Sequence, residues 1–139
     1  MSYNSIAAIY QNQKKYSEAL ELFHEALKIK KKVLDKDHPD IAVMYNNIAT
    51  IHNIQKDYQK AMDFFQKALE IREKKLAKEH ILTAITYNNL ASVCHNKGDY
   101  SEALEWYQKA LVILEKKLGK NHPHTTTTYN NITATFTLV

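Results

Sequence analysis

Apolar residues recur along this chain of 139 residues at intervals of three and four, the spacing of amphipathic helices. Within the segment 14–34, Ala19, Phe23 and Ala26 fall on one face of a helix. The small residues let a neighbouring helix approach closely, and the aromatic ring fills the gap between the two backbones. This face is widened by Leu20, Leu22, Leu27, Val33 and Leu34. The pattern predicts an amphipathic helix of about 18 residues.

The same helix recurs at a step of 42 residues, because the segments 14–34, 56–76 and 98–118 align in register. The alanine, aromatic and alanine positions return in the two later segments as Ala61, Phe65, Ala68, Ala103, Tyr107 and Ala110. A fixed period of this length is the signature of a repeat architecture, in which each unit packs against its neighbours.

Another helix is predicted in each repeat. It precedes the helix just described, so it is the first helix of the repeat, and the helices at 14–34, 56–76 and 98–118 are the second helices. Between Ile41 and Ile54, apolar residues again follow a helical spacing, at Met44, Tyr45, Ile48, Ala49 and Ile51. The tripeptide Tyr-Asn-Asn marks this helix at 45–47, 87–89 and 129–131. Turns are expected at Lys97-Gly98-Asp99 and in the linker 35–40, where Pro39 suits the first turn of the next helix.

One helix pair cannot bury its apolar face alone, so successive repeats must stack. We therefore predict an all-α fold, an α-solenoid of antiparallel helix pairs with three repeats and a partial fourth. A single array over residues 1–139 would hold repeats at 3–44, 45–86 and 87–128 and a partial repeat at 129–139. Because both ends of the sequence fall inside predicted helices, we expect a fragment of a longer protein.

Composition narrows the classes of partner. The formal net charge of +4 comes almost wholly from lysine, and Arg72 is the single arginine. Nucleic-acid readers rely on arginine for bidentate contacts, so we expect no specific nucleic-acid partner. No apolar run approaches the roughly 20 residues of a membrane span, and no secretory leader opens the chain. The single cysteine, Cys94, excludes an internal disulfide and fits a cytoplasmic location.

The order Tyr, Leu-Ala, Gly-Asp-Tyr, Glu-Ala, Tyr, Lys-Ala-Leu within 87–111 resembles the tetratricopeptide repeat, whose usual period is about 34 residues. The run LEKKLGKNHP at 114–123 is similar to the longer repeats of kinesin light chains. Some positions depart from that pattern. Gly119 fits it, but the equivalent positions of the two earlier repeats hold Asp35 and Ala77, and Ile81 stands where the other repeats have a proline.

This resemblance implies a non-catalytic scaffold that binds an extended peptide or partner segment in a concave groove lined by the first helices. The groove residues would be Asn46, Asn47, Thr50, Asn53, Asn88, Asn89, Ser92, His95 and Asn96. A carboxamide both donates and accepts hydrogen bonds, so it can bind a peptide backbone without demanding one side chain. The tyrosine of each Tyr-Asn-Asn would be a buried anchor. Alternatively, the asparagines are only solvated or join helices to each other.

A clamp for a C-terminal carboxylate is not expected. Related domains that use such a clamp carry lysine and arginine on these first helices. In this chain the corresponding positions hold Val43, Asn46, Asn47, Ile85, Asn88 and Asn89. The groove is therefore expected to be largely neutral.

Lysines instead recur at the ends of the second helices and form a possible basic edge. They are Lys32, Lys36, Lys74, Lys78, Lys116 and Lys120. Lysines at these ends complement helix dipoles and keep the surface solvated. The alternative is that the basic edge binds an acidic partner or a polyanion.

Catalysis finds little support in the sequence. His38, His80 and His122 are one position repeated at the 42-residue step rather than a cluster. Cys94 falls on the buried face, which favours packing over a nucleophilic role. We expect no enzyme activity, metal or cofactor in this segment. The alternative is a regulatory or sensor segment of a larger enzyme or NTPase.

The C-terminal residues combine two conflicting patterns. Ile132, Phe136 and Leu138 are apolar, whereas intervening threonines alternate with them at the period of a strand. We expect a helix up to about Ile132, followed by fraying or docking onto another copy. Ile6 and Ile9 near the other end would offer a matching surface, which predicts weak end-to-end self-association.

Overall fold

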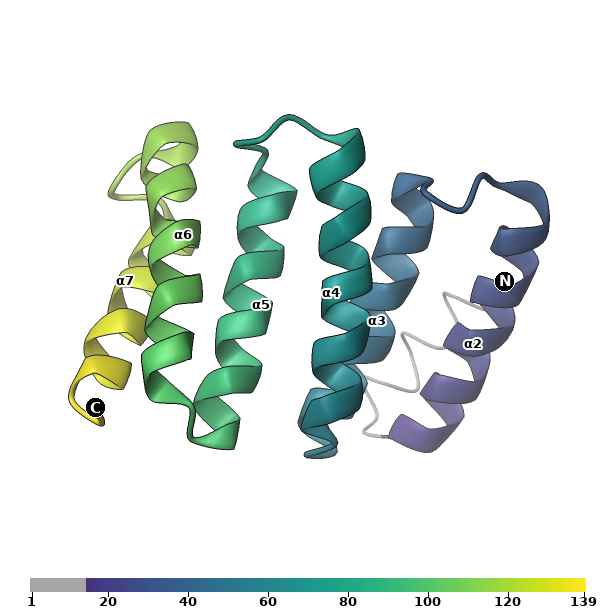
Figure 1. Ribbon diagram of the computed structural model, residues 1–139, viewed down its shortest axis with the longest axis horizontal. Helices are drawn as coiled ribbons and strands as arrows, with labels where there is room; N and C mark the ends of the chain where they lie inside the picture. The colour runs from purple at the N-terminus through teal and green to yellow at the C-terminus, as the bar shows by residue number, and fades with distance from the viewer. Residues whose placement is uncertain (1–14) are drawn as a thin grey trace. The chain divides into compact units, whose positions relative to one another are not determined.

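The computed structural model describes residues 15–139, which form six α-helices (Figure 1). These are α2 (Tyr16–Val33), α3 (Pro39–Ile54), α4 (Tyr58–Lys75), α5 (Ile81–Lys97), α6 (Tyr100–Leu118) and α7 (Pro123–Phe136). No strand occurs within 15–139, as the all-α prediction requires. The first predicted helix, with Ile6 and Ile9, lies outside the described residues.

The helices belong to two compact units, Met1–Lys75 and Leu76–Val139. In the first unit, α3 packs against both α2 and α4, and in the second unit α6 packs against both α5 and α7. Consecutive helices within each unit run in opposite directions (Figure 1). The predicted antiparallel helix pairs are therefore present in both units, and α2 has the predicted length of 18 residues.

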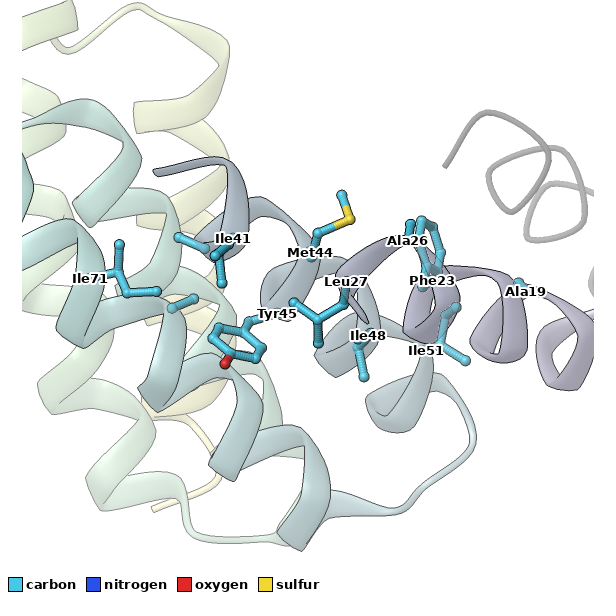
Figure 2. Packing of buried hydrophobic residues seen from close by; sticks show 12 residues of the cluster. Ala19, Phe23, Ala26, Leu27, Ile41, Met44, Tyr45, Ile48, Ile51 and Ile71 are labelled. Atoms are coloured by element: carbon cyan, nitrogen blue, oxygen red, sulfur yellow. The ribbon is translucent and has the colours of Figure 1, made fainter. Parts of the chain in front are cut away.

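The alanine and aromatic positions that repeat every 42 residues are all buried, which confirms the predicted helix face. In the first unit, Phe23 and Leu27 of α2 lie against Ile48 and neighbouring apolar residues of α3 (Figure 2). The prediction for Val33 was wrong, because this side chain is 76% exposed. The backbone becomes extended at Leu34, and Leu34 rather than Val33 packs against the core.

The three histidines of the linkers cap the helices that follow them. His38 Nδ1 accepts a hydrogen bond from the backbone N–H of Asp40 at 3.1 Å. His80 and His122 do the same for the N–H two residues on, at 3.0 and 3.1 Å. Each bond satisfies one of the N–H groups that the first turn of a helix leaves without an intrahelical partner. This explains why histidine recurs at one position per repeat.

The turns that end α3 and α5 share one geometry. Gly98 has a φ of 91°, and Lys56, one repeat earlier, has a φ of 66°. In both turns the next residue, Asp57 or Asp99, donates its backbone N–H to a helix carbonyl five residues back, at 2.8 Å. A left-handed residue is the usual device that turns a helix end in this way. The break predicted at Gly98 is confirmed.

Helix α7 continues to Phe136, so the fraying predicted after Ile132 was wrong. Its threonines bond to carbonyls of the preceding turn, as Thr133 Oγ1 does to Tyr129 O at 3.1 Å. These local bonds accommodate β-branched residues inside the helix. Tyr129 and Phe136 are 59% and 70% exposed, so Tyr129 is not the buried anchor that was predicted. Self-association through the apolar residues at the end of α7 stays a prediction.

Candidate functional site

A pocket of about 390 Å³ lies within the second unit. It is lined by Asn88, Asn89, Ser92, His95, Tyr107, Thr127, Asn131, Ala134 and Thr135. Eight of these nine side chains can form hydrogen bonds, and none is an aspartate, glutamate, lysine or arginine. The pocket therefore carries many hydrogen-bonding groups and no fixed charge.

Helical periodicity brings these residues together. Asn88, Ser92 and His95 are spaced by four and three along α5, so they share one face of that helix. Thr127, Asn131 and Ala134 have the same spacing along α7. The two helices both pack against α6, which contributes the buried Tyr107.

Two side-chain contacts join α5 to α7 beside the pocket. Asn88 Nδ2 donates to Thr128 Oγ1 at 2.8 Å, and this hydroxyl donates in turn to the carbonyl of His124 at 3.0 Å. His95 Nδ1 lies 2.9 Å from the buried hydroxyl of Thr135. These contacts bridge the two walls of the pocket. The other amide atom, Asn88 Oδ1, is buried without a hydrogen-bond partner.

Four residues predicted for a groove in the third repeat line this pocket: Asn88, Asn89, Ser92 and His95. The fifth, Asn96, is exposed near the end of α5 and does not line it. In the first unit, the predicted residues occupy the same positions of α3, 42 residues earlier, and are partly exposed: Asn46, Asn47, Thr50 and Asn53. Thr50 Oγ1 donates to the carbonyl of Asn46 at 2.9 Å. Peptide binding by either set stays a prediction.

Sequence reasoning missed five lining residues, Tyr107, Thr127, Asn131, Ala134 and Thr135. A signal for Asn131 was present, since it repeats Asn47 and Asn89 at the 42-residue step.

The buried tyrosine anchor is confirmed for Tyr45, which is 9% exposed. Its ring lies 5.9 Å from that of Phe64, and the Lys67 ammonium is 5.6 Å from its centroid. In the second unit the half-buried Tyr87 stacks on Trp106 with ring centroids 5.6 Å apart. Each tyrosine thus joins the two helices of its own repeat, which leaves the asparagines that follow it to form the polar face.

The repeat pattern and the helix pairs agree with one known family. The sequence model of the tetratricopeptide repeat matches residues 1–74 and 82–138. The chain belongs to the tetratricopeptide repeat family. Tetratricopeptide repeats are generally protein–protein interaction modules and non-enzymatic scaffolds.

Solved structures of tetratricopeptide repeat arrays share the fold. BtubC (BKLC) from P. vanneervenii matches with a TM-score of 0.90 at 24% identity, over 98% of this chain and 54% of that chain. A putative kinesin light chain with nearly identical TPR-like repeats from Podosopora anserina gives a TM-score of 0.88 at 23% identity, over 98% and 64% of the two chains. The N-terminal domain of stress-induced protein-1 from C. elegans gives 0.66 at 18% identity, over 94% and 91%.

This chain therefore spans 54% and 64% of the first two of these proteins. The predicted α-solenoid and the similarity to kinesin light chain repeats are confirmed. No curated protein matches the chain.

The basic edge of this tetratricopeptide repeat array is partly neutralised. Lys74 Nζ lies 3.1 Å from Asp37 Oδ2 in the first unit, and Lys116 Nζ lies 2.7 Å from Glu79 Oε2 in the second. Hydrogen bonds from these lysines lower the pKa values of the two carboxyl groups. The remaining members of the edge are exposed: Lys32, Lys36, Lys78 and Lys120.

Cys94 packs inside the second unit of the repeat array. Burial, reinforced by the neighbouring Glu102 carboxylate, raises the pKa of its thiol to about 12. The thiol therefore stays protonated at neutral pH, in agreement with a packing role. Within 15–139, no group of three or more metal-binding side chains comes together. None of the helices there is long and apolar enough to cross a membrane.

Proposed function

We propose that this chain is a non-catalytic scaffold that binds extended, largely neutral segments of partner proteins at the polar face of α3 in the first unit and at that of α5 in the second. The observation that carries the proposal is the pocket of the second unit, where asparagine, serine and threonine side chains converge without a lysine or arginine. A cytoplasmic location is part of the proposal, since the single cysteine is buried as a thiol.

Hydrogen bonding explains why such a face suits an extended chain. An extended segment exposes backbone N–H and C=O groups that need partners when water is displaced. Asparagine side chains supply both kinds of partner, and Asn131 lies across the pocket from the asparagines of α5. Affinity would then come from many neutral hydrogen bonds rather than from charge attraction.

The competing proposal, binding of a polyanion to the basic edge, is weakened by two ion pairs. Lys74 and Lys116 are already engaged by Asp37 and Glu79, so an anion would have to displace a carboxylate from each. A carboxylate clamp is likewise weakened, because no lysine or arginine lines the pocket.

The test begins with a random peptide display library selected on the purified chain. The tightest peptide is then measured by calorimetry against the double variant Asn47→Ala with Asn89→Ala. We expect a loss of affinity of about tenfold or more, because each alanine removes a donor and an acceptor.

The matched control is Asn121→Ala with Asn130→Ala, which removes two exposed asparagines that do not line the pocket. Circular dichroism should show equal helicity for both double variants. Unchanged affinity in Asn47→Ala with Asn89→Ala, or failure to select any peptide, overturns the proposal.

A further inference from the structure

The groups that line the pocket of the second unit indicate which kind of side chain it can bind. Its walls offer hydrogen-bond donors and acceptors together, from the carboxamides of α5 and α7 and from hydroxyl groups. It holds no aspartate, glutamate, lysine or arginine that could pair with a charged guest. Its volume of about 390 Å³ is large enough for one long side chain together with the adjoining backbone.

Three kinds of guest side chain can be compared on these grounds. A charged side chain would be removed from water without an opposite charge, which is costly. An apolar side chain would cover Asn131 and Thr127 without offering either of them a hydrogen bond. A neutral side chain that both donates and accepts avoids both costs, and a carboxamide does so from one planar group.

We infer that this pocket receives the carboxamide side chain of a glutamine or asparagine in the bound partner segment, so that it sets the sequence preference of the scaffold. The inference rests on the proposed function and names the residue type that the site selects.

The wall of α5 shows where a donor is missing. Asn88 uses its amide nitrogen to bond Thr128, while its Oδ1 is buried with no hydrogen-bond partner. This oxygen has almost no accessible surface, so a guest amide N–H can satisfy it only if the Asn88 side chain turns toward the pocket; a carboxylate or a methyl group would not satisfy it even then. The half-buried Asn131 on the opposite wall supplies both a donor and an acceptor for the remaining guest atoms.

The test uses three blocked tripeptides that differ only in the central side chain: acetyl-Ala-Gln-Ala-amide and its Glu and Met counterparts. Each is titrated into ¹⁵N-labelled chain at about pH 7.5, above the titration range of ordinary imidazoles. We expect the glutamine peptide to bind about tenfold more tightly than either counterpart, with shifts of the Asn88 and Asn131 side-chain amide signals.

Two matched pairs of variants locate the effect. Asn131→Ala should remove the preference for glutamine, whereas Asn130→Ala, the exposed neighbour outside the pocket, should keep it. Thr127→Lys places a cation in the wall and should reverse the preference toward the glutamate peptide. Thr126→Lys adds the same charge to an exposed neighbour outside the pocket and should not reverse it.

The possible outcomes separate this inference from the proposed function. Equal or tighter binding of the Glu or Met peptide overturns the carboxamide preference. If library-selected peptides bind but the glutamine peptide leaves Asn131 unshifted, the inference fails and the scaffold proposal stands. If no peptide of either kind binds, both fail.

Discussion

The Lys116 ammonium lies 2.7 Å from the Glu79 carboxylate, and the pair joins the end of α6 to the linker before α5. One repeat earlier, Lys74 and Asp37 form the same pair at 3.1 Å. These two contacts tie the linkers before α3 and α5 to the second helix of the following repeat. Two lysines of the basic edge therefore form ion pairs inside their own unit.

The first prediction concerns the pKa of Glu79. The hydrogen bond and charge of Lys116 lower it from the ordinary value of 4.5. A lowered carboxyl pKa means that the pair stabilises the fold above pH 4.5 and that this contribution is lost as the pH falls through the folded-state pKa.

Carboxyl titration by NMR should therefore place the Glu79 pKa below that of an ordinary glutamate. Lys116→Ala should move it most of the way back, and the matched control Lys117→Ala should move it less, since Lys117 makes a smaller contribution. An equal response to both variants would contradict the assignment.

The second prediction concerns the histidine caps. His80→Ala should lower the free energy of unfolding by about 1 kcal/mol, because the Leu82 N–H loses its acceptor. His80→Asn should retain most of the stability, since asparagine is a favoured capping residue. Urea denaturation of the two variants measures the difference. If both variants lose the same amount, capping is not the role of this histidine.

The third prediction compares Lys56 with Gly98, which occupy the same left-handed turn one repeat apart. A side chain is strained at such a φ, whereas glycine is not. Lys56→Gly should raise the free energy of unfolding by about 0.5–1 kcal/mol, and Gly98→Lys should lower it by a similar amount. Nothing lies within 4 Å of a Cβ added at Gly98, so the backbone conformation alone would cause the loss. Thermal unfolding of the two variants measures these changes, and changes in stability of the same sign would contradict the prediction.

The fourth prediction concerns His52 of α3. Its ring stacks on Phe64 at 5.8 Å, and its Nδ1 is buried without a hydrogen-bond partner. Burial lowers its pKa from 6.5; Lys60 and His24 act in the same direction, and Asp57 opposes them. A lowered histidine pKa means that stability is fully present above pH 6.5 and is lost as the pH falls from 6.5 to the folded-state pKa.

His52→Phe keeps the stacked ring but removes the titrating group. Its stability should depend less on pH between 6.5 and the lowered pKa of the wild type, as measured by urea denaturation. The pKa of His24 is lowered too, so His24→Asn in the same background should remove part of the remaining dependence. A profile unchanged by His52→Phe would contradict this assignment.

The sequence alone was sufficient for the helices because the information about them is local. Alanine and aromatic residues three and four apart specify one buried face, and the 42-residue step shows that the face is repeated. Val33 has the right spacing but is exposed, because the backbone straightens just beyond it. The spacing of apolar residues along a helix does not show at which residue the helix stops packing against the adjacent helix.

The candidate site was only half predictable from the sequence. The α5 wall follows from the Tyr-Asn-Asn repeat, whereas Thr127, Ala134 and Thr135 of the α7 wall differ in residue type from the positions 42 residues earlier, so the repeat does not mark them. The hydrogen bonds that keep the threonines of α7 helical, such as that between Thr133 and Tyr129, and the contact between His95 and Thr135 become visible only in three dimensions. The ion pair between Lys116 and Glu79 also depends on tertiary structure.

The fifth prediction tests the central claim, that the polar faces of α3 and α5 rather than the basic edge bind the partner; the pocket between α5 and α7 reports on it in the second unit. A library-selected peptide is titrated into ¹⁵N-labelled chain in about 0.1 M and about 1 M salt, where screening lengths are roughly 10 and 3 Å. We predict shifts at Asn89, Ser92 and Asn131 and an affinity that changes less than about threefold between the two salt concentrations. Shifts centred on Lys78 and Lys120, with affinity falling steeply as salt is added, would contradict the claim.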